Sequence, residues 1–507
     1  MIRTSDTEST PDSLSAFLRR RAIALAVVLS TAAALFFQLM VPPITGLSNN
    51  GDFEKIMGIV GLEYPAGTSE RGKHFHYATT RLAFGRGAWW PNGYRTSETL
   101  LVRLMMVPAR AFGGGRYFDI RWIGGAHATL FVLFLAVIGI ALARSLGSAG
   151  IVALLAAGFF FSDVGYVGPM NTLYGQEASY VSLFGIAAVL AAAFARKRFT
   201  PLLAAGYLAS SVFFMTSKPQ EAPQAAVLAA GALWFGLPSG GRARALGVLI
   251  AAALLSVGFV YSRAISVQMV RQSLRQAVFD EVLRYSPDPR RDLREIGLDP
   301  ALADDSARSL AIDAAREERS LVRLDYSTLV RFYVTHPGRT ASILARTARA
   351  AMVIRPPAFG DLPESAAKRP RARSHRFSAW SHARAKAAAA GPYLLALIFG
   401  GAFGLALHSV RRGDPGSVLG GKSVILLVAL GVVDFGVCAL MNSHVEIERH
   451  LYVFDAITDT LLAIGLAKGW TVLGERLRAR RFGRQEQRIN GSSMRPQKVD
   501  SSRTETA

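Results

Sequence analysis

Three short polar segments of this chain carry side chains of the kinds that perform acid–base and phosphate chemistry. They are residues 49–55, with two carboxylates, residues 216–221, with a lysine, and residues 442–452, with an arginine. A carboxylate can accept a proton from a hydroxyl group. A guanidinium or ammonium group binds phosphate oxygens through charge-assisted hydrogen bonds. What these groups do therefore depends on the elements that position them.

Long apolar runs flank each of these polar segments. The chain is 51% hydrophobic, its mean hydropathy is +0.27, and a run of roughly twenty apolar residues can cross a bilayer as a helix. Ten spans are predicted, at residues 22–40, 122–143, 149–161, 178–194, 201–215, 222–237, 245–261, 392–408, 424–441 and 452–470. The third and fifth spans are short, so a tilted or partial crossing of the membrane is an alternative for them. The sequence thus predicts an all-α polytopic membrane protein with about ten transmembrane helices.

The positive charge of the chain fits the topology of such a protein. The net charge is +22, and the predicted inner loops are basic, so the charge indicates orientation and no nucleic-acid partner is predicted. Arg19, Arg20 and Arg21 precede the first span and indicate a cytoplasmic N-terminus. The predicted parts are a cytoplasmic tail (1–21), a membrane domain of spans one to seven (22–261) with outer loop 41–121, a mainly helical extracytoplasmic loop domain (262–391), spans eight to ten (392–470), and a basic cytoplasmic tail (471–507).

Two other patterns have simpler interpretations. Residues 416–423 match the P-loop pattern GxxxxGKS, but that pattern binds nucleotides only between a strand and a helix. Here it joins two spans, so ATP binding is not predicted and Lys422 marks the cytoplasmic end of a span. The basic stretch 368–386 lies in the large outer loop, where it either binds lipid phosphates or forms a solvated face.

The arrangement of spans and polar segments resembles the GT-C class of membrane glycosyltransferases. The shared features are a carboxylate in the first outer loop, about ten helices, short inner turns and a large outer loop late in the chain. Within that class the closest resemblance is to bacterial hexose transferases of surface-glycan assembly, the WsfD-like group, and it covers most of residues 22–470. The resemblance implies an enzyme of the bacterial inner membrane with an extracytoplasmic active site. Its partners would be a polyprenyl-phosphate-linked hexose as donor, a glycan or lipid-linked acceptor, and membrane lipids.

Asp52 is the position that matches the general base of the GT-C pattern. An acceptor hydroxyl must lose its proton as it attacks the anomeric carbon, whereas the phosphate leaves as a stable anion and needs no acid. Glu54 is the second catalytic candidate. The alternative for Asp52 is an Asx turn that caps a helix after Gly51. No metal site is predicted, although a divalent metal stays open as a cofactor.

The carrier phosphate requires cations at the membrane boundary. Arg449 resembles the arginine that contacts the carrier phosphate in GT-C enzymes, with Lys218 and His450 as further candidates. The alternatives are an ion pair of Arg449 with a neighbouring glutamate, Glu446 or Glu448, and a Lys218 side chain that reaches to water.

Aromatic, amide and carboxylate side chains supply the candidates for sugar binding. Aromatic faces pack on the C–H surfaces of sugars, and amides and carboxylates bind hydroxyl groups. The candidates are Asn50, Tyr174, Gln176, Glu177, Gln220, His444 and Glu448. Ordinary loop capping is the alternative for residues 171–177. His74 and His76 have metal-like spacing but lack a third ligand nearby.

Two other classes of function compete with glycosyl transfer. A lipid-linked glycan flippase or other transporter would place charged groups along the middle of its spans. Asp434 is the main such residue here, and no internal repeat is visible. A non-catalytic assembly scaffold would leave the polar outer segments without a joint purpose.

Overall fold

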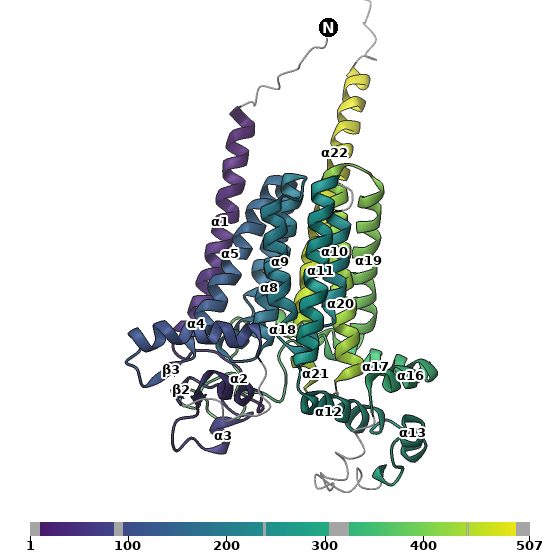
Figure 1. Cartoon of the computed structure of the whole chain (residues 1–507). Coiled ribbons are helices and arrows are strands. Elements are labelled where there is room, and N and C mark those ends of the chain that lie inside the picture. The colour runs from purple at the N-terminus through teal and green to yellow at the C-terminus, as the bar shows by residue number, and fades with distance from the viewer. Residues whose placement is uncertain are drawn as a thin grey trace, which may run out of the picture.

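Long apolar helices run side by side in a bundle (Figure 1). The computed structural model describes residues 11–85, 95–236, 240–303, 324–442, 444 and 446–492, without the side chains of residues 11–14, 478 and 480–492. The ten helices are α1 (Pro11–Met40), α5 (Arg121–Leu146), α6 (Ser148–Phe161), α8 (Gln176–Arg196), α9 (Pro201–Met215), α10 (Gln224–Gly236), α11 (Gly241–Ala264), α19 (Gly391–Arg411), α20 (Pro415–Met441) and α22 (Tyr452–Ser492). Each coincides with one predicted span, so the predicted fold class is confirmed.

Not every apolar helix is a full crossing. Within the described part of the chain, seven are long and apolar enough to span a membrane alone: α1, α5, α8, α11, α19, α20 and α22. Helix α6 and the short helices α7 (Val164–Val167) and η1 (Gly168–Asn171) meet at a bend of 67°, and together they are either a broken eighth span or a re-entrant loop. Asp163 stabilises the bend because its carboxylate caps the Gly165 amide. Helices α9 and α10 are shorter, with 15 and 13 residues, and residue 237 at the end of the predicted sixth span lies outside the described residues.

Aromatic side chains fill the centre of the bundle where α5, α6 and α8 meet. Phe131 stacks on Tyr180 with ring centroids 5.6 Å apart and meets the edge of Phe184 at 4.7 Å. All three rings are buried. Such packing stabilises a membrane bundle through van der Waals contact, since lipid tails are as apolar as the side chains.

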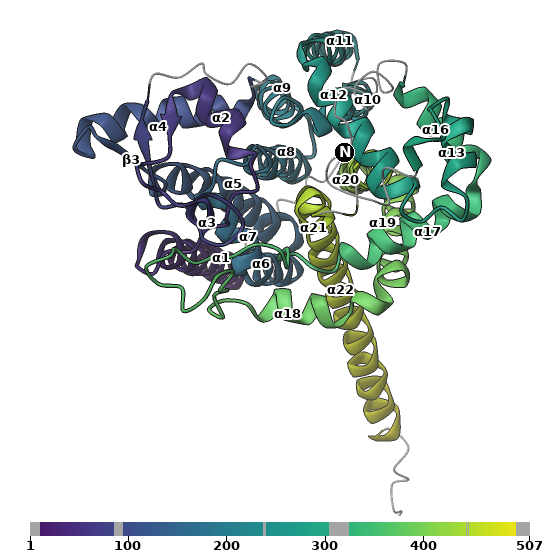
Figure 2. The same ribbon diagram turned by 90° about the horizontal axis from the view of Figure 1, so that it is seen from below.

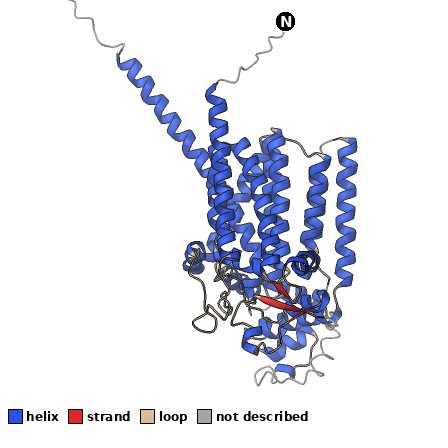
Figure 3. Ribbon diagram, turned by 90° about the vertical axis from the view of Figure 1, so that its left-hand side faces the viewer, coloured by secondary structure: helices blue, strands red, loops and turns tan. Residues whose placement is uncertain are grey.

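The termini of the bundle helices divide the molecule into two ends. Helix α1 begins and helix α22 ends at the same end, at the top of Figure 1, and both long polar segments lie at the opposite end, called here the loop end. Figure 3 shows the same separation from the side, with the strands among the loop-end elements. Seen from below, α21 (Ile447–His450) and the start of α22 lie between the helices of the first half and α10, α19 and α20 (Figure 2).

The first long segment folds into short helices and a small sheet at the loop end. Its elements are α2 (Phe53–Val60), β1 (Leu62–Glu63), α3 (Glu70–Lys73), β2 (Arg81–Phe84), α4 (Ser97–Phe112) and β3 (Tyr117–Asp119). The strands are antiparallel in the order β1-β2-β3, with Leu82 opposite Phe118. Both of these side chains are buried under α4, so the sheet has an apolar core of its own.

The second long segment is mainly helical, as predicted. Its elements are α12 (Val267–Arg275), the π-helix η4 (Gln276–Val282), α13 (Pro289–Ile296), α16 (Tyr326–Thr335), α17 (Pro337–Ala350), α18 (Ala379–Lys386) and η5 (Ala388–Ala390). Backbone hydrogen bonds join it to the first segment: the Ser48 amide donates to the Gly360 carbonyl at 2.9 Å and the Ala78 amide to Leu362 at 3.0 Å. The two segments therefore form one layer.

The basic stretch 368–386 and the P-loop match both lie within ordinary structural elements. Arg384 of α18 is buried and paired with Asp455 and Asp459 of α22, so this residue belongs to neither a lipid-binding nor a solvated face. The GxxxxGKS match lies in the first turns of helix α20, where the Lys422 ammonium donates to the Trp234 carbonyl.

Candidate active site

A cavity of about 600 Å³ opens at the loop end where residues from distant parts of the chain meet. Its polar lining includes Asn50, Asp52, Lys55, Lys218, Gln220, Glu446, Arg449 and His450. An apolar flank is contributed by Ile265, Met269, Val270, Val437 and Met441. The three polar segments singled out in the sequence thus converge on one cavity. The chemical roles assigned to their residues stay predictions.

The local fold frees the Asp52 side chain to face this cavity. The side-chain oxygen of Asn49 accepts hydrogen bonds from the amides of Gly51 and Phe53, and that of Asn50 accepts one from the Asp52 amide. These asparagines do the capping that Asp52 could have done, and Asp52 itself makes no capping hydrogen bond to α2. Gly51 adopts a φ of 106°, which favours glycine at this turn.

Two cations hold the Asp52 carboxylate. The Lys55 ammonium lies 2.7 Å from one oxygen and the Arg449 guanidinium lies 2.9 Å from the other. Withdrawal from water alone would raise the pKa of Asp52, but Arg449 and Lys55 together lower it well below its usual value. Asp52 is therefore ionised throughout the ordinary pH range and is a weak base while both cations hold it.

Arg449 is buried, with 4% of its side chain exposed, and lies between several groups. Its Nη2 contacts Glu446 at 3.4 Å as well as Asp52, and its guanidinium lies 4.7 Å from the centre of the Tyr174 ring. Burial alone would lower its pKa, but Asp52, Tyr174 and Glu446 raise it. The buried Nε has no hydrogen-bond partner among the described residues. This unused donor on a permanent cation fits an anionic ligand.

Glu446 is a cavity residue that the sequence analysis considered only as a salt-bridge partner. It has a left-handed φ of 59°, and such strain at a non-glycine residue occurs most often at functional sites. Asn50 donates to its carboxylate at 2.6 Å. The sequence signal that could have identified it is its position in the same polar segment as Arg449, three residues away.

Lys218, His450 and Gln220 form the other side of the polar lining. The Lys218 ammonium donates to Nδ1 of His450 at 3.1 Å, and Gln220 donates to the His450 carbonyl at 3.2 Å. Burial, Lys218 and Arg449 lower the pKa of His450 well below its usual value. Burial and the charge of Arg449 also lower the pKa of Lys218. His450 is therefore a neutral hydrogen-bonding group, and the charges available for a phosphate are those of Arg449, Lys218 and Lys55.

Glu54 faces away from the cavity. Asn49 donates to it at 2.8 Å, and Nε2 of His74 lies 2.8 Å from its other oxygen. Asp52 and Glu54 therefore bind different partners and do not share a site for a metal ion. Among the described residues, the group with metal-like geometry is Asp292, Glu295 and His336, far along the chain in the second long segment. Arg339 already holds both oxygens of Asp292.

The remaining predicted sugar-binding residues do not line this cavity. Tyr174 lies beneath Arg449 and donates to the Ser48 carbonyl at 2.8 Å. Gln176 and Glu177 are buried in the first turn of α8, where Glu177 accepts a hydrogen bond from Tyr452. His444 pairs with Glu281 at 3.3 Å. The structure thus brings Asn50 and Gln220 to the cavity and gives Tyr174 a supporting position; Glu448 is likewise absent from the lining.

A family model for the YfdI N-terminal transmembrane domain matches residues 12–490. The match covers all ten apolar helices and both long polar segments. No curated protein and no solved structure matches the chain.

Proposed function

Because the chain belongs to the family of the YfdI N-terminal transmembrane domain, which is associated with glycosyltransferase activity, we propose that it transfers a hexose between a polyprenyl-phosphate carrier and an acceptor. The acceptor is a surface glycan or a lipid-linked glycan, and the loop end faces away from the cytoplasm. The observation that carries the proposal is the single cavity in which Asp52 meets three cations, Lys55, Lys218 and Arg449. The finer resemblance to WsfD-like enzymes is consistent with it.

The proposed reaction uses Asp52, Arg449 and Lys218. An acceptor hydroxyl oxygen attacks the anomeric carbon and loses its proton to Asp52. The bond from that carbon to the phosphate oxygen breaks, and the electron pair leaves with the carrier phosphate. Arg449 and Lys218 bind the phosphate oxygens and stabilise the charge that develops there.

The shared position of Arg449 suggests how donor binding would activate the base. Arg449 and Lys55 weaken the basicity of Asp52. A donor phosphate that occupies the unpaired Nε of Arg449 competes for the same guanidinium. The negative charge of the phosphate also raises the proton affinity of the nearby carboxylate. Asp52 would thus become a stronger base only when the donor is in place.

The charges of the cavity suit a carrier with one phosphate. Three cationic side chains face two carboxylates, those of Asp52 and Glu446. The surplus of one positive charge balances the single charge of a sugar phosphodiester without requiring a divalent cation. The apolar flank formed by α12 and the end of α20 would receive the first isoprene units of the carrier.

The deciding experiment supplies purified protein in lipid nanodiscs with a polyprenyl-phosphate hexose and a glycan acceptor, without ATP. Transfer of radiolabelled hexose is expected from the lipid-linked donor and not from a nucleotide sugar. The Asp52→Asn protein is the control for background hydrolysis. Transfer from a nucleotide sugar without a lipid carrier would refute the proposal. Movement of the lipid-linked sugar across vesicles without any transfer would favour a flippase instead.

A further inference from the structure

Helix α4 lies crosswise at the loop end of the bundle, beside the ends of α1 and α5, and extends beyond them (Figure 1). A capping box formed by Thr96 and Thr99 fixes its start. One face is buried against the small sheet and α5 through Leu101, Val102 and Ala109. The helix is thus firmly attached at the level where the membrane-spanning helices end.

The opposite face of α4 is apolar and exposed. Leu100, Leu104 and Val107 are 52%, 51% and 69% exposed, and Ala111 continues the same stripe one turn later. Their spacing of three or four residues puts them on one side of the helix. An exposed apolar stripe on a helix at the membrane boundary is typical of an interfacial helix whose apolar side enters the lipid.

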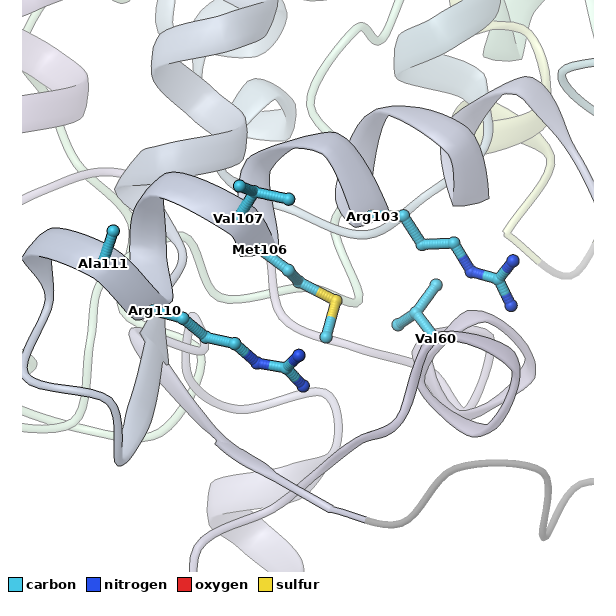
Figure 4. Close-up of a pocket in the computed structure, with 6 residues that line it drawn as sticks. All are labelled: Val60, Arg103, Met106, Val107, Arg110 and Ala111. Carbon is cyan, nitrogen blue, oxygen red and sulfur yellow. The ribbon is translucent and has the colours of Figure 1, made fainter.

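Two arginines border this stripe and line a pocket of about 600 Å³ together with Val60, Met106 and the stripe residues Val107 and Ala111. Figure 4 shows Arg103 and Arg110 extending from one side of α4, with Val107 and Ala111, which also line the pocket, on an adjacent side of the helix. Arg103 and Arg110 are seven residues apart, so they lie two turns apart on the same face. Arg103 donates to the Ile59 carbonyl at 3.0 Å, and Arg110 lies over the Phe84 ring at 4.7 Å.

Neither guanidinium is neutralised. Among the residues that the structure describes, no carboxylate lies within ion-pair distance of Arg103 or Arg110. Their contacts with Ile59 and Phe84 orient the two groups but leave both positive charges uncompensated. Two exposed cations at the edge of a lipid-facing stripe are complementary to a lipid with a negatively charged phosphate.

We propose that this pocket binds the phosphate headgroup of an anionic glycerophospholipid from the leaflet at the loop end. Arg103 and Arg110 bind the headgroup oxygens, and the acyl chains lie along Leu104 and Val107. A lipid is favoured over free phosphate because the charged pocket and the apolar stripe adjoin each other on one helix. The inference does not depend on the proposed glycosyl transfer.

The test compares lipid binding by the full-length protein and its variants. Wild type and Arg103→Gln/Arg110→Gln are titrated in detergent with a fluorescent phosphatidylglycerol and a matched phosphatidylcholine. Each arginine near a lipid surface contributes about fivefold in affinity, so the double variant should bind phosphatidylglycerol roughly thirtyfold more weakly. Phosphatidylcholine binding should not change.

Three controls make the result specific. Arg331→Gln removes an exposed arginine of α16 and should leave phosphatidylglycerol binding unchanged. Arg103→Lys/Arg110→Lys keeps both charges and should retain most of the affinity. Thermal unfolding checks that the variants are folded. Undiminished phosphatidylglycerol binding by the glutamine double variant would overturn the proposal, and so would displacement of the lipid by millimolar inorganic phosphate.

Discussion

Two buried arginines of this protein each bind a pair of carboxylates. They differ in the other contacts that each guanidinium group makes. Arg384 contacts Asp459 at 3.0 Å and Asp455 at 2.9 Å, and it also donates to the Tyr166 hydroxyl and the Ala351 carbonyl. Arg449 contacts Asp52 at 2.9 Å and Glu446 at 3.4 Å, and its Nε has no partner among the described residues. Both arginines are 4% exposed.

The difference separates a structural ion cluster from a binding site. The groups around Arg384 accept hydrogen bonds from both of its Nη atoms, and they fasten α18 and the second long segment to α22. The groups around Arg449 leave a donor unused, border a cavity and include a strained residue, Glu446. Burial and pairing alone therefore do not identify a functional arginine, whereas an unpaired donor on an arginine that also lines a cavity is a reason to expect a ligand.

The largest expected effect comes from Asp52→Asn. If Asp52 is the base, the amide removes the proton acceptor, and turnover should fall by about two to four orders of magnitude. The capping by Asn49 and Asn50 is kept, so any loss of thermal stability should come only from the ion pairs with Arg449 and Lys55. The measurement is the transfer rate at saturating donor beside thermal unfolding. Turnover within a few-fold of wild type would remove Asp52 from the mechanism.

Arg384→Met should act on folding instead. It leaves Asp455 and Asp459 buried without their cation, and breaking such a buried pair costs about 3–5 kcal/mol. The unfolding temperature in detergent should fall well below that of wild type, while any folded fraction keeps its donor KM. Arg449→Met is the matched comparison. Equal destabilisation by both substitutions would contradict the distinction between the two clusters.

Arg449→Gln should weaken donor binding and change the pH profile. Losing a charge-assisted contact of about 1.5–3 kcal/mol raises the donor KM roughly 10- to 150-fold. In wild type Arg449 helps hold the pKa of Asp52 below 3.8, so activity should show no acidic limb from Asp52 above that pH. Without Arg449 the burial of Asp52 is less opposed, so its pKa rises and the acidic limb moves to higher pH. If the initial rates of Arg449→Gln and wild type have the same dependence on pH, Asp52 is not the titrating base.

The apolar spans and their order could be predicted from the sequence because hydrophobic length is a local property. The bend after α6 was not predictable in the same way, since it depends on Asp163 and on contacts with the second long segment. Likewise, the sequence identified both Asp52 and Glu54 as catalytic candidates. Only the tertiary contacts of Asn49 and His74 show that their side chains face different surroundings.

The candidate site could be predicted only in part, because it also depends on tertiary contacts. Asp52, Lys218 and Arg449 stand out as polar residues next to apolar runs, and they meet in one cavity. Glu177 and His444 have similar residue types and similar positions at span ends, but they pair with Tyr452 and Glu281. Helix rotation and partners far along the chain determine which polar residue at a span end faces a cavity. Neither of these is a local property of the sequence.

The smallest expected effect is that of Glu54→Gln, which tests whether the two neighbouring carboxylates have different roles. Glu54 accepts a hydrogen bond from Asn49 and contacts His74 outside the cavity, and glutamine retains one oxygen to accept from Asn49. Turnover should therefore stay within about threefold of wild type, with stability lowered by at most about 1 kcal/mol for the altered contact with His74. Transfer rates and thermal unfolding measured beside Asp52→Asn make the comparison direct. A loss of turnover as large as that of Asp52→Asn, without loss of stability, would mean that Glu54 reaches the reacting groups and that the two carboxylates act together.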